Sequence, residues 1–358
     1  MIAGGGSGGH IYPAIAIGRA LMKDSPDFQV RFVGTPEGLE KKIMLRENLP
    51  LDLIQGGKLN FSGNFLQKIK TILKIPVGLI QSFFLIIKHK PVFVLGVGGY
   101  ASGPFLLMAT FMGRKTALWE PNAHPGMANR VLSKFVSMAY LVFDEAKKDL
   151  RSKNFKVFGM PLREEIDSAQ MNRQKKELNK KLMILCFGGS QGSLFLNRAL
   201  SDYILRHPEM HSEIEVIHQT GSAGFNEMKE KYKNVSCVQI HEYIYDMPSF
   251  YKKADVQFCR GGASTIAEAA AFGVVPIIIP LNAADSHQLK NAEAVEQAGA
   301  GFLIKQDEFT TARFHQIITK LKNDPTYRET ISENLKKLAP HQAADEIAKD
   351  VLRQVNIT

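Results

Sequence analysis

The chain has few cysteines and no long apolar run, and both absences limit what it can be. Its three cysteines, Cys186, Cys237 and Cys259, lie far apart and form no CxxC pair. This spacing argues against a disulfide framework or a zinc site and fits a reducing cytoplasm. The longest nearly apolar run, residues 75–87, is interrupted by proline and glycine and is too short to span a bilayer.

The chain also has fewer acidic than basic residues, and its formal net charge is +10. Positive charge of this size favours an anionic partner, such as a nucleotide, a nucleic acid or a phospholipid surface. We find no arginine-rich arm and no basic residues interleaved with aromatic ones, so we expect no nucleic acid partner. We also find no DxD-like acidic pair placed to hold a divalent metal, and we predict neither a metal nor a cofactor.

The region 68–90 mixes leucine, isoleucine and phenylalanine with basic residues near its two ends. One interpretation is a buried helix with a solvated edge. The other is an interfacial patch, with apolar side chains in the lipid boundary and lysines on anionic headgroups. The sequence leaves both open. The lysines concerned are Lys68, Lys70, Lys74, Lys88 and Lys90.

Strand-like and helix-like segments alternate along the chain, which predicts an α/β fold of parallel sheets covered by helices. The pattern restarts with a strand and a glycine loop after residues 159–163. We therefore expect two Rossmann-like domains, 1–160 and 161–341, that face each other across a cleft. The apolar strand candidates are residues 30–33, 92–95, 116–119, 138–142 and 156–157, then 182–187, 215–219, 235–240, 256–259 and 275–279.

Each end of the chain carries one expectation. Residues 345–355 have the pattern of an amphipathic helix, and we expect the segment 342–358 to pack back on the first domain. Only three residues precede the first glycine loop, so we expect that a few residues of the first strand are missing.

The chain opens with a glycine-dense loop, GGGSGGH at residues 4–10, that leads into a helix. Glycine lets the backbone bend tightly and approach a ligand, and the N-terminus of a helix binds anions. We expect Pro13 in the first turn of that helix, where its missing N–H is tolerated. The positive helix end favours a neutral imidazole on His10. His10 is therefore a candidate general base, with a structural cap as the alternative.

Gly4, Gly6 and Gly9 also satisfy GxGxxG, the fingerprint of a dinucleotide site. Such a site needs an acidic residue at the end of the second strand, and here that strand ends in Gly34 and Thr35. An NAD-dependent oxidoreductase is therefore disfavoured. A tight turn that binds no ligand remains an alternative.

Two further glycine-rich turns follow strands in the second half. GGSQGS at 188–193 begins one helix, and CRGGASTIAEAAAFG at 259–273 contains another, which Ser264 or Thr265 can cap and Gly273 can end. Glu268 is either a capping-box glutamate or an acceptor for ribose hydroxyls. The loop PLNAADSHQLKNA at 280–292 suits a sugar, with a polar surface loop as the alternative.

Two loops of the first half also follow strands. GVGGYASGP at 96–104 is glycine-rich, and WEPNAHPG at 119–126 adds Glu120, Asn122 and His124. Together with the loop 4–10, these loops would line one side of the predicted cleft.

Five motifs follow one another over nearly the whole chain: GGGSGGH, GVGGYASGP, GGSQGS, CRGGASTIAE and PLNAADSHQ. GMPLR at 159–163 and EYIYDM at 242–247 accompany them. In this set and order the sequence resembles the MurG family, the peptidoglycan N-acetylglucosaminyltransferases that convert lipid I to lipid II. The resemblance implies the GT-B fold and a peripheral protein at the cytoplasmic face of the cell (inner) membrane.

The same resemblance implies partners and site residues. UDP-GlcNAc and lipid I would be substrates, region 68–90 would meet an anionic membrane surface, and cell-wall or division proteins would be further partners. The residues implied for UDP-GlcNAc are Ser7, Gly8, Gly9, Asn122, Arg163, Ser190, Ile244, Ala263, Ser264, Thr265, Ile266, Ala267, Glu268 and Gln288. The residues implied for the acceptor diphosphate are Gly5, Gly6, Gly98, Gly99, Tyr100 and Ser102.

These implications give a mechanism for an inverting, metal-independent hexosyltransferase. The MurNAc 4-hydroxyl of lipid I attacks the anomeric carbon of GlcNAc, a base takes its proton, and UDP leaves from the opposite face. His10 is the expected base and Glu120 the reserve candidate. Helix N-termini would stabilise the departing diphosphate. The main alternative is a UDP-GlcNAc 2-epimerase on the same fold, and a non-catalytic scaffold protein is another.

Overall fold

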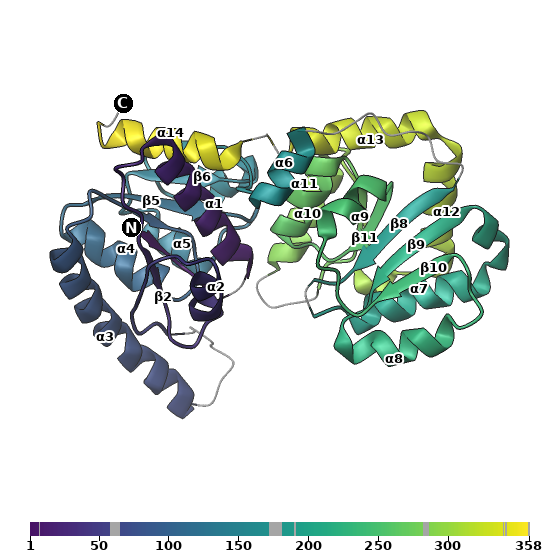
Figure 1. Cartoon of the computed structure of the whole chain (residues 1–358), viewed down its shortest axis with the longest axis horizontal. Helices are drawn as coiled ribbons and strands as arrows, with labels where there is room; N and C mark the ends of the chain where they lie inside the picture. The colour runs from purple at the N-terminus through teal and green to yellow at the C-terminus, as the bar shows by residue number, and fades with distance from the viewer. Residues whose placement is uncertain are drawn as a thin grey trace. The chain divides into compact units, whose positions relative to one another are not determined.

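The chain forms two compact units, Met1–Arg163 with Gln342–Thr358, and Glu164–His341. Each unit holds one parallel sheet with helices packed on it (Figure 1). The predicted α/β class with two Rossmann-like sheets is confirmed. The structure is a computed structural model that describes residues 1–6, 8–57, 65–171, 181–189, 191–281, 286–338, 340 and 342–356, without the side chains of 65–73 and 169–171.

The first unit has a seven-stranded sheet in the order β3-β2-β1-β4-β5-β6-β7. The order reverses between β1 and β4, which is the switch point where ligands bind in such folds. Its strands are β1 (Ile2–Ala3), β2 (Phe32–Gly34), β3 (Leu51–Leu53), β4 (Phe93–Gly96), β5 (Lys115–Glu120), β6 (Met138–Leu141) and β7 (Phe155–Val157). Its helices are α1 (Gly8–Asp24), α2 (Glu40–Arg46), α3 (Phe65–His89), α4 (Ser102–Phe111), α5 (Met127–Leu132), η1 (Asp144–Asp149) and α14 (Ala343–Gln354).

The second unit repeats this plan with the order β10-β9-β8-β11-β12-β13 and a switch point between β8 and β11. Its strands are β8 (Leu182–Phe187), β9 (Ile214–Gln219), β10 (Val238–His241), β11 (Val256–Cys259), β12 (Val275–Ile278) and β13 (Phe302–Leu303). Its helices are α6 (Glu164–Met171), α7 (Leu194–Arg206), η2 (Pro208–Ser212), α8 (Ser222–Lys231), α9 (Met247–Lys253), α10 (Ala263–Phe272), α11 (His287–Gln297), η3 (Gln306–Glu308), α12 (Thr311–Asn323) and α13 (Pro325–Lys337).

The central strands form the core of each sheet because they are apolar on both faces. In the second unit Ile184, Cys186, Val256 and Phe258 are fully buried with the helices that cover them. Near-continuous apolar strands of this kind are typical of parallel sheets. They also hold the loops at their carboxyl ends in fixed positions.

The last helix, α14, packs along α1 in the first unit (Figure 1). Polar contacts beneath it fix its position. The Tyr140 hydroxyl donates a hydrogen bond to Asp350 (2.8 Å), Lys156 forms an ion pair with the same carboxylate, and Gln354 donates to the Tyr140 oxygen (2.9 Å). These partners join α14 to β6 and β7.

One expectation about α1 is wrong. The helix begins at Gly8, so Pro13 lies inside it, beyond the first turn. Pro13 supplies no N–H to the carbonyl of Gly9, which weakens the start of the helix. Tertiary packing outweighs this loss, since Ile11, Ile15 and Ile17 on α1 are buried.

Candidate active site

The carboxyl ends of β1 and β4 bring two glycine loops together at the switch point of the first unit. The Gly5 N–H donates to the Gly98 carbonyl (3.2 Å). A Cβ on Gly99 would lie 2.1 Å from the Gly5 carbonyl oxygen, and the φ of Gly99 is 80°, so only glycine fits there. A Cβ on Gly6 would lie 3.7 Å from the Tyr100 ring. Five residues implied for the acceptor diphosphate thus lie in one place.

His10 lies in the first turn of α1, beside these loops. A Cβ on Gly98 would lie 2.8 Å from His10 Cε1, so the imidazole rests against the loop that follows β4. The first N–H groups of a helix have no intrahelical partner and attract negative charge. The carboxyl edge of the first sheet therefore combines a helix N-terminus that can bind an anion with an imidazole.

Two residues implied for the site are buried instead of facing a ligand. Ser102 is 1% exposed, and its Oγ lies under the β4 loop, 2.5 Å from where a Cβ on Gly96 would be. This position argues against contact between its hydroxyl and a diphosphate. Glu120 is also 1% exposed.

The Glu120 carboxylate accepts hydrogen bonds from the loop that follows it and from helix α5. It accepts hydrogen bonds from the N–H groups of Asn122 (2.9 Å) and Gly126 (3.1 Å) and from Nδ2 of Asn129 (2.8 Å). Burial raises the pKa of Glu120 above that of an ordinary glutamate. These bonds shape the loop 121–126 and shield the carboxylate, which argues for a structural role of Glu120 and against the role of reserve base.

A second buried carboxylate, Glu40, was not predicted from the sequence. It is 1% exposed, and its Oε1 accepts hydrogen bonds from Thr35 N and Oγ1, both at 3.2 Å. A Cβ on Gly5 would lie 1.9 Å from the same oxygen. An acid therefore does follow β2, but it lies beneath the glycine loop, where a ribose cannot reach it. This burial is a second argument against a dinucleotide site.

In the second unit, β11 leads through two glycines into α10. Gly262 is the N-cap of α10, and no side chain caps this terminus. The expected cap by Ser264 or Thr265 is therefore wrong, and so is the capping-box interpretation of Glu268. Gly273 ends the helix in the left-handed conformation, as expected. The open terminus of α10 can bind an anion.

Arg260 joins three loops at this edge and was not predicted from the sequence. Its guanidinium donates to Ser193 Oγ (2.9 Å), to the Ile279 carbonyl (3.1 Å) and to Gln306 Oε1 (3.0 Å). Burial lowers its pKa from that of an ordinary arginine. These three acceptors are neutral, so the positive charge remains available to an anion. The signal in the sequence was an arginine directly after an apolar strand.

Gln219 has a similar role at the end of β9. Its Nε2 donates to the Gly189 carbonyl (2.9 Å), and its Oε1 accepts from the Ile244 N–H (3.0 Å). It therefore connects the glycine loop after β8 with Ile244, one of the residues implied for UDP-GlcNAc. The sequence could not show this because the three residues are far apart in the chain.

Glu268 and Gln288 lie on the two helices that begin at this edge. Glu268 is in the second turn of α10, and its Oε2 accepts from the Tyr251 hydroxyl (3.4 Å). Gln288 is in the first turn of α11, and its Oε1 accepts from the Leu281 N–H (2.9 Å). A Cβ on Gly261 would lie 2.3 Å from the Gln288 carbonyl oxygen, so the loop after β11 approaches α11 closely.

The other residues implied for UDP-GlcNAc lie in both units. Gly8 and Gly9 begin α1. Asn122 donates from Nδ2 to Glu120 (3.1 Å), and the Arg163 guanidinium lies 5.4 Å above the Tyr12 ring. On α10, Ala263, Ile266 and Ala267 are buried. Ser7 and Ser190 lie outside the described residues.

The helix α3 presents an apolar face to solvent. Val77, Ile80, Phe84 and Ile87 repeat at helical spacing and are between 45% and 63% exposed. This exposure favours an interfacial patch over a buried helix. The side chains of Lys68 and Lys70 are outside the described part, and Lys74 pairs with Glu37 (2.6 Å). No helix in the described part is long and apolar enough to cross a membrane.

Known proteins resemble the chain over nearly its whole length. Residues 1–141 match the glycosyltransferase family 28 N-terminal domain, and residues 183–349 match the C-terminal domain of that family. A UDP-N-acetylglucosamine--N-acetylmuramyl-(pentapeptide) pyrophosphoryl-undecaprenol N-acetylglucosamine transferase from Bdellovibrio bacteriovorus is 52% identical over 354 residues. The match covers 99% of this chain and 98% of the relative.

Solved structures agree with this relationship. The crystal structure of MurG from Acinetobacter baumannii is 26% identical with a TM-score of 0.78, and 99% of each chain is covered. The UDP-GlcNAc 2-epimerase of Neisseria meningitidis has a TM-score of 0.70 at 15% identity, covering 98% of each chain, and this likeness shows the fold alone. The chain therefore belongs to the MurG family of N-acetylglucosaminyltransferases.

Proposed function

We propose that this chain moves GlcNAc from UDP-GlcNAc to the MurNAc 4-hydroxyl of lipid I and so forms lipid II for peptidoglycan synthesis. The 52% identity to the Bdellovibrio transferase over nearly the whole chain carries this proposal. Two anion sites at the two switch points support it, because donor and acceptor each contain a diphosphate.

The second unit is proposed to hold UDP-GlcNAc. The terminus of α10 and the charge of Arg260 suit the diphosphate, and the Glu268 carboxylate suits the vicinal hydroxyls of the ribose. Uracil would bind beside Ile244, whose backbone is held by Gln219 and whose side chain is buried. As UDP leaves, the backbone N–H groups of α10 would stabilise the growing negative charge without having to reorganise.

The first unit is proposed to hold the acceptor. The lipid diphosphate would bind the backbone of Gly5, Gly6, Gly98 and Gly99, and His10 would take the proton from the attacking hydroxyl. A single displacement with UDP leaving from the opposite face inverts the anomeric centre. Because helix N-termini and Arg260 supply positive charge, we propose that transfer needs no divalent metal.

The exposed face of α3 is proposed to dock on the cytoplasmic face of the cell membrane, where lipid I presents its head group. Apolar side chains would enter the lipid boundary while Lys88 and Lys90 meet anionic headgroups. Replacing Phe83 and Phe84 together by serine should reduce co-sedimentation with anionic vesicles. Leu45→Ser, at an 81% exposed position of α2, is the matched control and should bind like the unmodified chain.

The proposed activity is tested with labelled UDP-GlcNAc and a lipid I analogue. We expect label in the lipid product, one UDP released per transfer, and the same rate in EDTA. With UDP-GlcNAc alone, formation of UDP-ManNAc would instead identify an epimerase. Loss of transfer in EDTA with recovery in Mg²⁺ would contradict the metal-independent mechanism.

A further inference from the structure

A second group of ligand-type side chains lies at the opposite end of α7 from the donor edge. His207 caps the C-terminus of α7, Glu209 follows in η2, and His315 is on α12. One ligand atom from each residue lies within 4.8 Å of the other two. Helix α7 has 13 residues, so about 20 Å separates this group from Ser193 at the donor edge.

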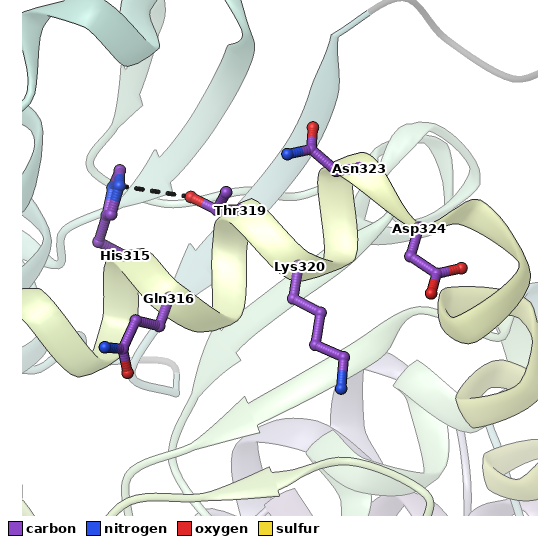
Figure 2. A pocket seen from close by; sticks show the side chains of 6 residues that line it. All are labelled: His315, Gln316, Thr319, Lys320, Asn323 and Asp324. Carbon is purple, nitrogen blue, oxygen red and sulfur yellow. Dashed lines mark hydrogen bonds between the residues drawn. The ribbon is translucent and has the colours of Figure 1, made fainter.

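The two imidazoles already lie against each other. Their rings stack with centroids 4.4 Å apart and an interplanar angle of 10°. Glu209 Oε1 lies 2.8 Å from His207 Nδ1. Within the described part of the chain, the hydrogen bonds of the His315 nitrogens are long, 3.5 Å to the Tyr203 hydroxyl and 3.4 Å to Thr319 Oγ1, the second drawn in Figure 2. Such weak partners are easily exchanged for a metal ion.

The local charge favours a cation. The Glu209 carboxylate lies next to His207 and close to His315, and it supplies one negative charge. His207 lies at the C-terminus of α7, where the helix dipole is negative. A pocket of about 390 Å³ beside His315, lined by α12 and its C-cap residue Asp324, leaves room for the ring to move (Figure 2).

We propose that His207, Glu209 and His315 bind one Zn²⁺ or a similar transition-metal ion that joins the end of α7 to α12. Two imidazole nitrogens and one carboxylate oxygen are ligands that Zn²⁺ prefers, whereas Mg²⁺ and Ca²⁺ prefer oxygen alone. One ring tilts against the other on binding, because both lone pairs must point at one ion. The site stabilises the second unit and takes no part in sugar transfer.

The test is a titration of the untagged full-length chain, freed of metal, with Zn²⁺ in a calorimeter. We expect one ion per chain and a higher Tm in its presence. His315→Ala should weaken binding at least about tenfold, since even changes to groups behind metal ligands have effects of that size. Glu209→Gln, at an exposed position, tests the same site with little risk to folding.

Gln316→Ala, the next residue on α12, is the matched control and should bind Zn²⁺ like the unmodified chain. Co²⁺ gives an independent readout, since nitrogen ligands change its visible spectrum, and this change should be lost in His315→Ala. The proposal is overturned if no binding of one ion per chain is found. It is equally overturned if His315→Ala and Glu209→Gln both bind as tightly as the unmodified chain.

Discussion

The two units share one strand order but differ in what they place at the carboxyl edge of their sheets. The first unit lines its edge with bare glycine backbone and one imidazole, and buries its carboxylates, Glu40 and Glu120, beneath the loops. The second unit keeps Arg260, Glu268 and an uncapped helix terminus at its edge. We propose that the same fold offers an edge for proton removal in the first unit and a positively charged nucleotide site in the second.

Arg260→Gln should impair the donor site of the second unit and leave the first unit unchanged. Loss of the charged bonds to Ser193 and Ile279 frees two loops and removes positive charge from the proposed diphosphate site. Because hydrogen bonds of charged groups contribute about 1.5–3 kcal/mol, KM for UDP-GlcNAc should rise about tenfold or more, with a smaller change in kcat. Steady-state kinetics with both substrates varied measures this.

Arg198→Gln is the control for that variant. Arg198 is on α7 and pairs with Glu227 at the surface, so its loss should leave KM unchanged. An unchanged KM in Arg260→Gln would remove Arg260 from the donor site.

Glu120→Gln tests whether Glu120 in the first unit supports the fold or takes part in catalysis. The amide nitrogen of glutamine would face N–H donors of Asn122, Gly126 or Asn129 and leave one bond unmade. We expect a loss of about 1–3 kcal/mol in the free energy of unfolding, with most turnover kept at low temperature. Urea unfolding and kinetics on one preparation test this. Turnover lost at full stability would return Glu120 to the role of base.

His218 should make the second unit sensitive to acid. Burial lowers its pKa from 6.5 to about 3, so between these values the unfolded chain binds a proton that the folded chain does not. Its contribution is complete above pH 6.5 and falls as the pH drops, by about 2 kcal/mol at pH 5. Hydrogen exchange at pH 7 and pH 5 should show protection lost around β9. Equal protection at both pH values would contradict the buried neutral state.

The sequence predicted the central strands well because they are buried on both faces. Residues 182–187 and 256–259 were located to the residue, whereas β3 and β13, which are short and lie at the edges of their sheets, were missed. The glycine motifs were located for a similar local reason, since tight turns depend on neighbouring residues.

The supporting residues could not be predicted in the same way. Arg260, Gln219 and Glu40 act through partners that are distant in the chain or packed under a loop, and a linear pattern does not show these contacts. The burial of Glu120 could not be predicted either, because the sequence shows only a carboxylate in a polar loop.

The division of roles between the two edges is tested most directly by His10→Ala, with transfer to a lipid I analogue and UDP affinity measured on one preparation. We expect turnover to fall by about 10²–10⁴-fold while UDP binds as tightly as to the unmodified chain. Near-normal turnover would contradict His10 as the base. A matching loss of UDP affinity would contradict the separation of the acceptor edge from the donor edge.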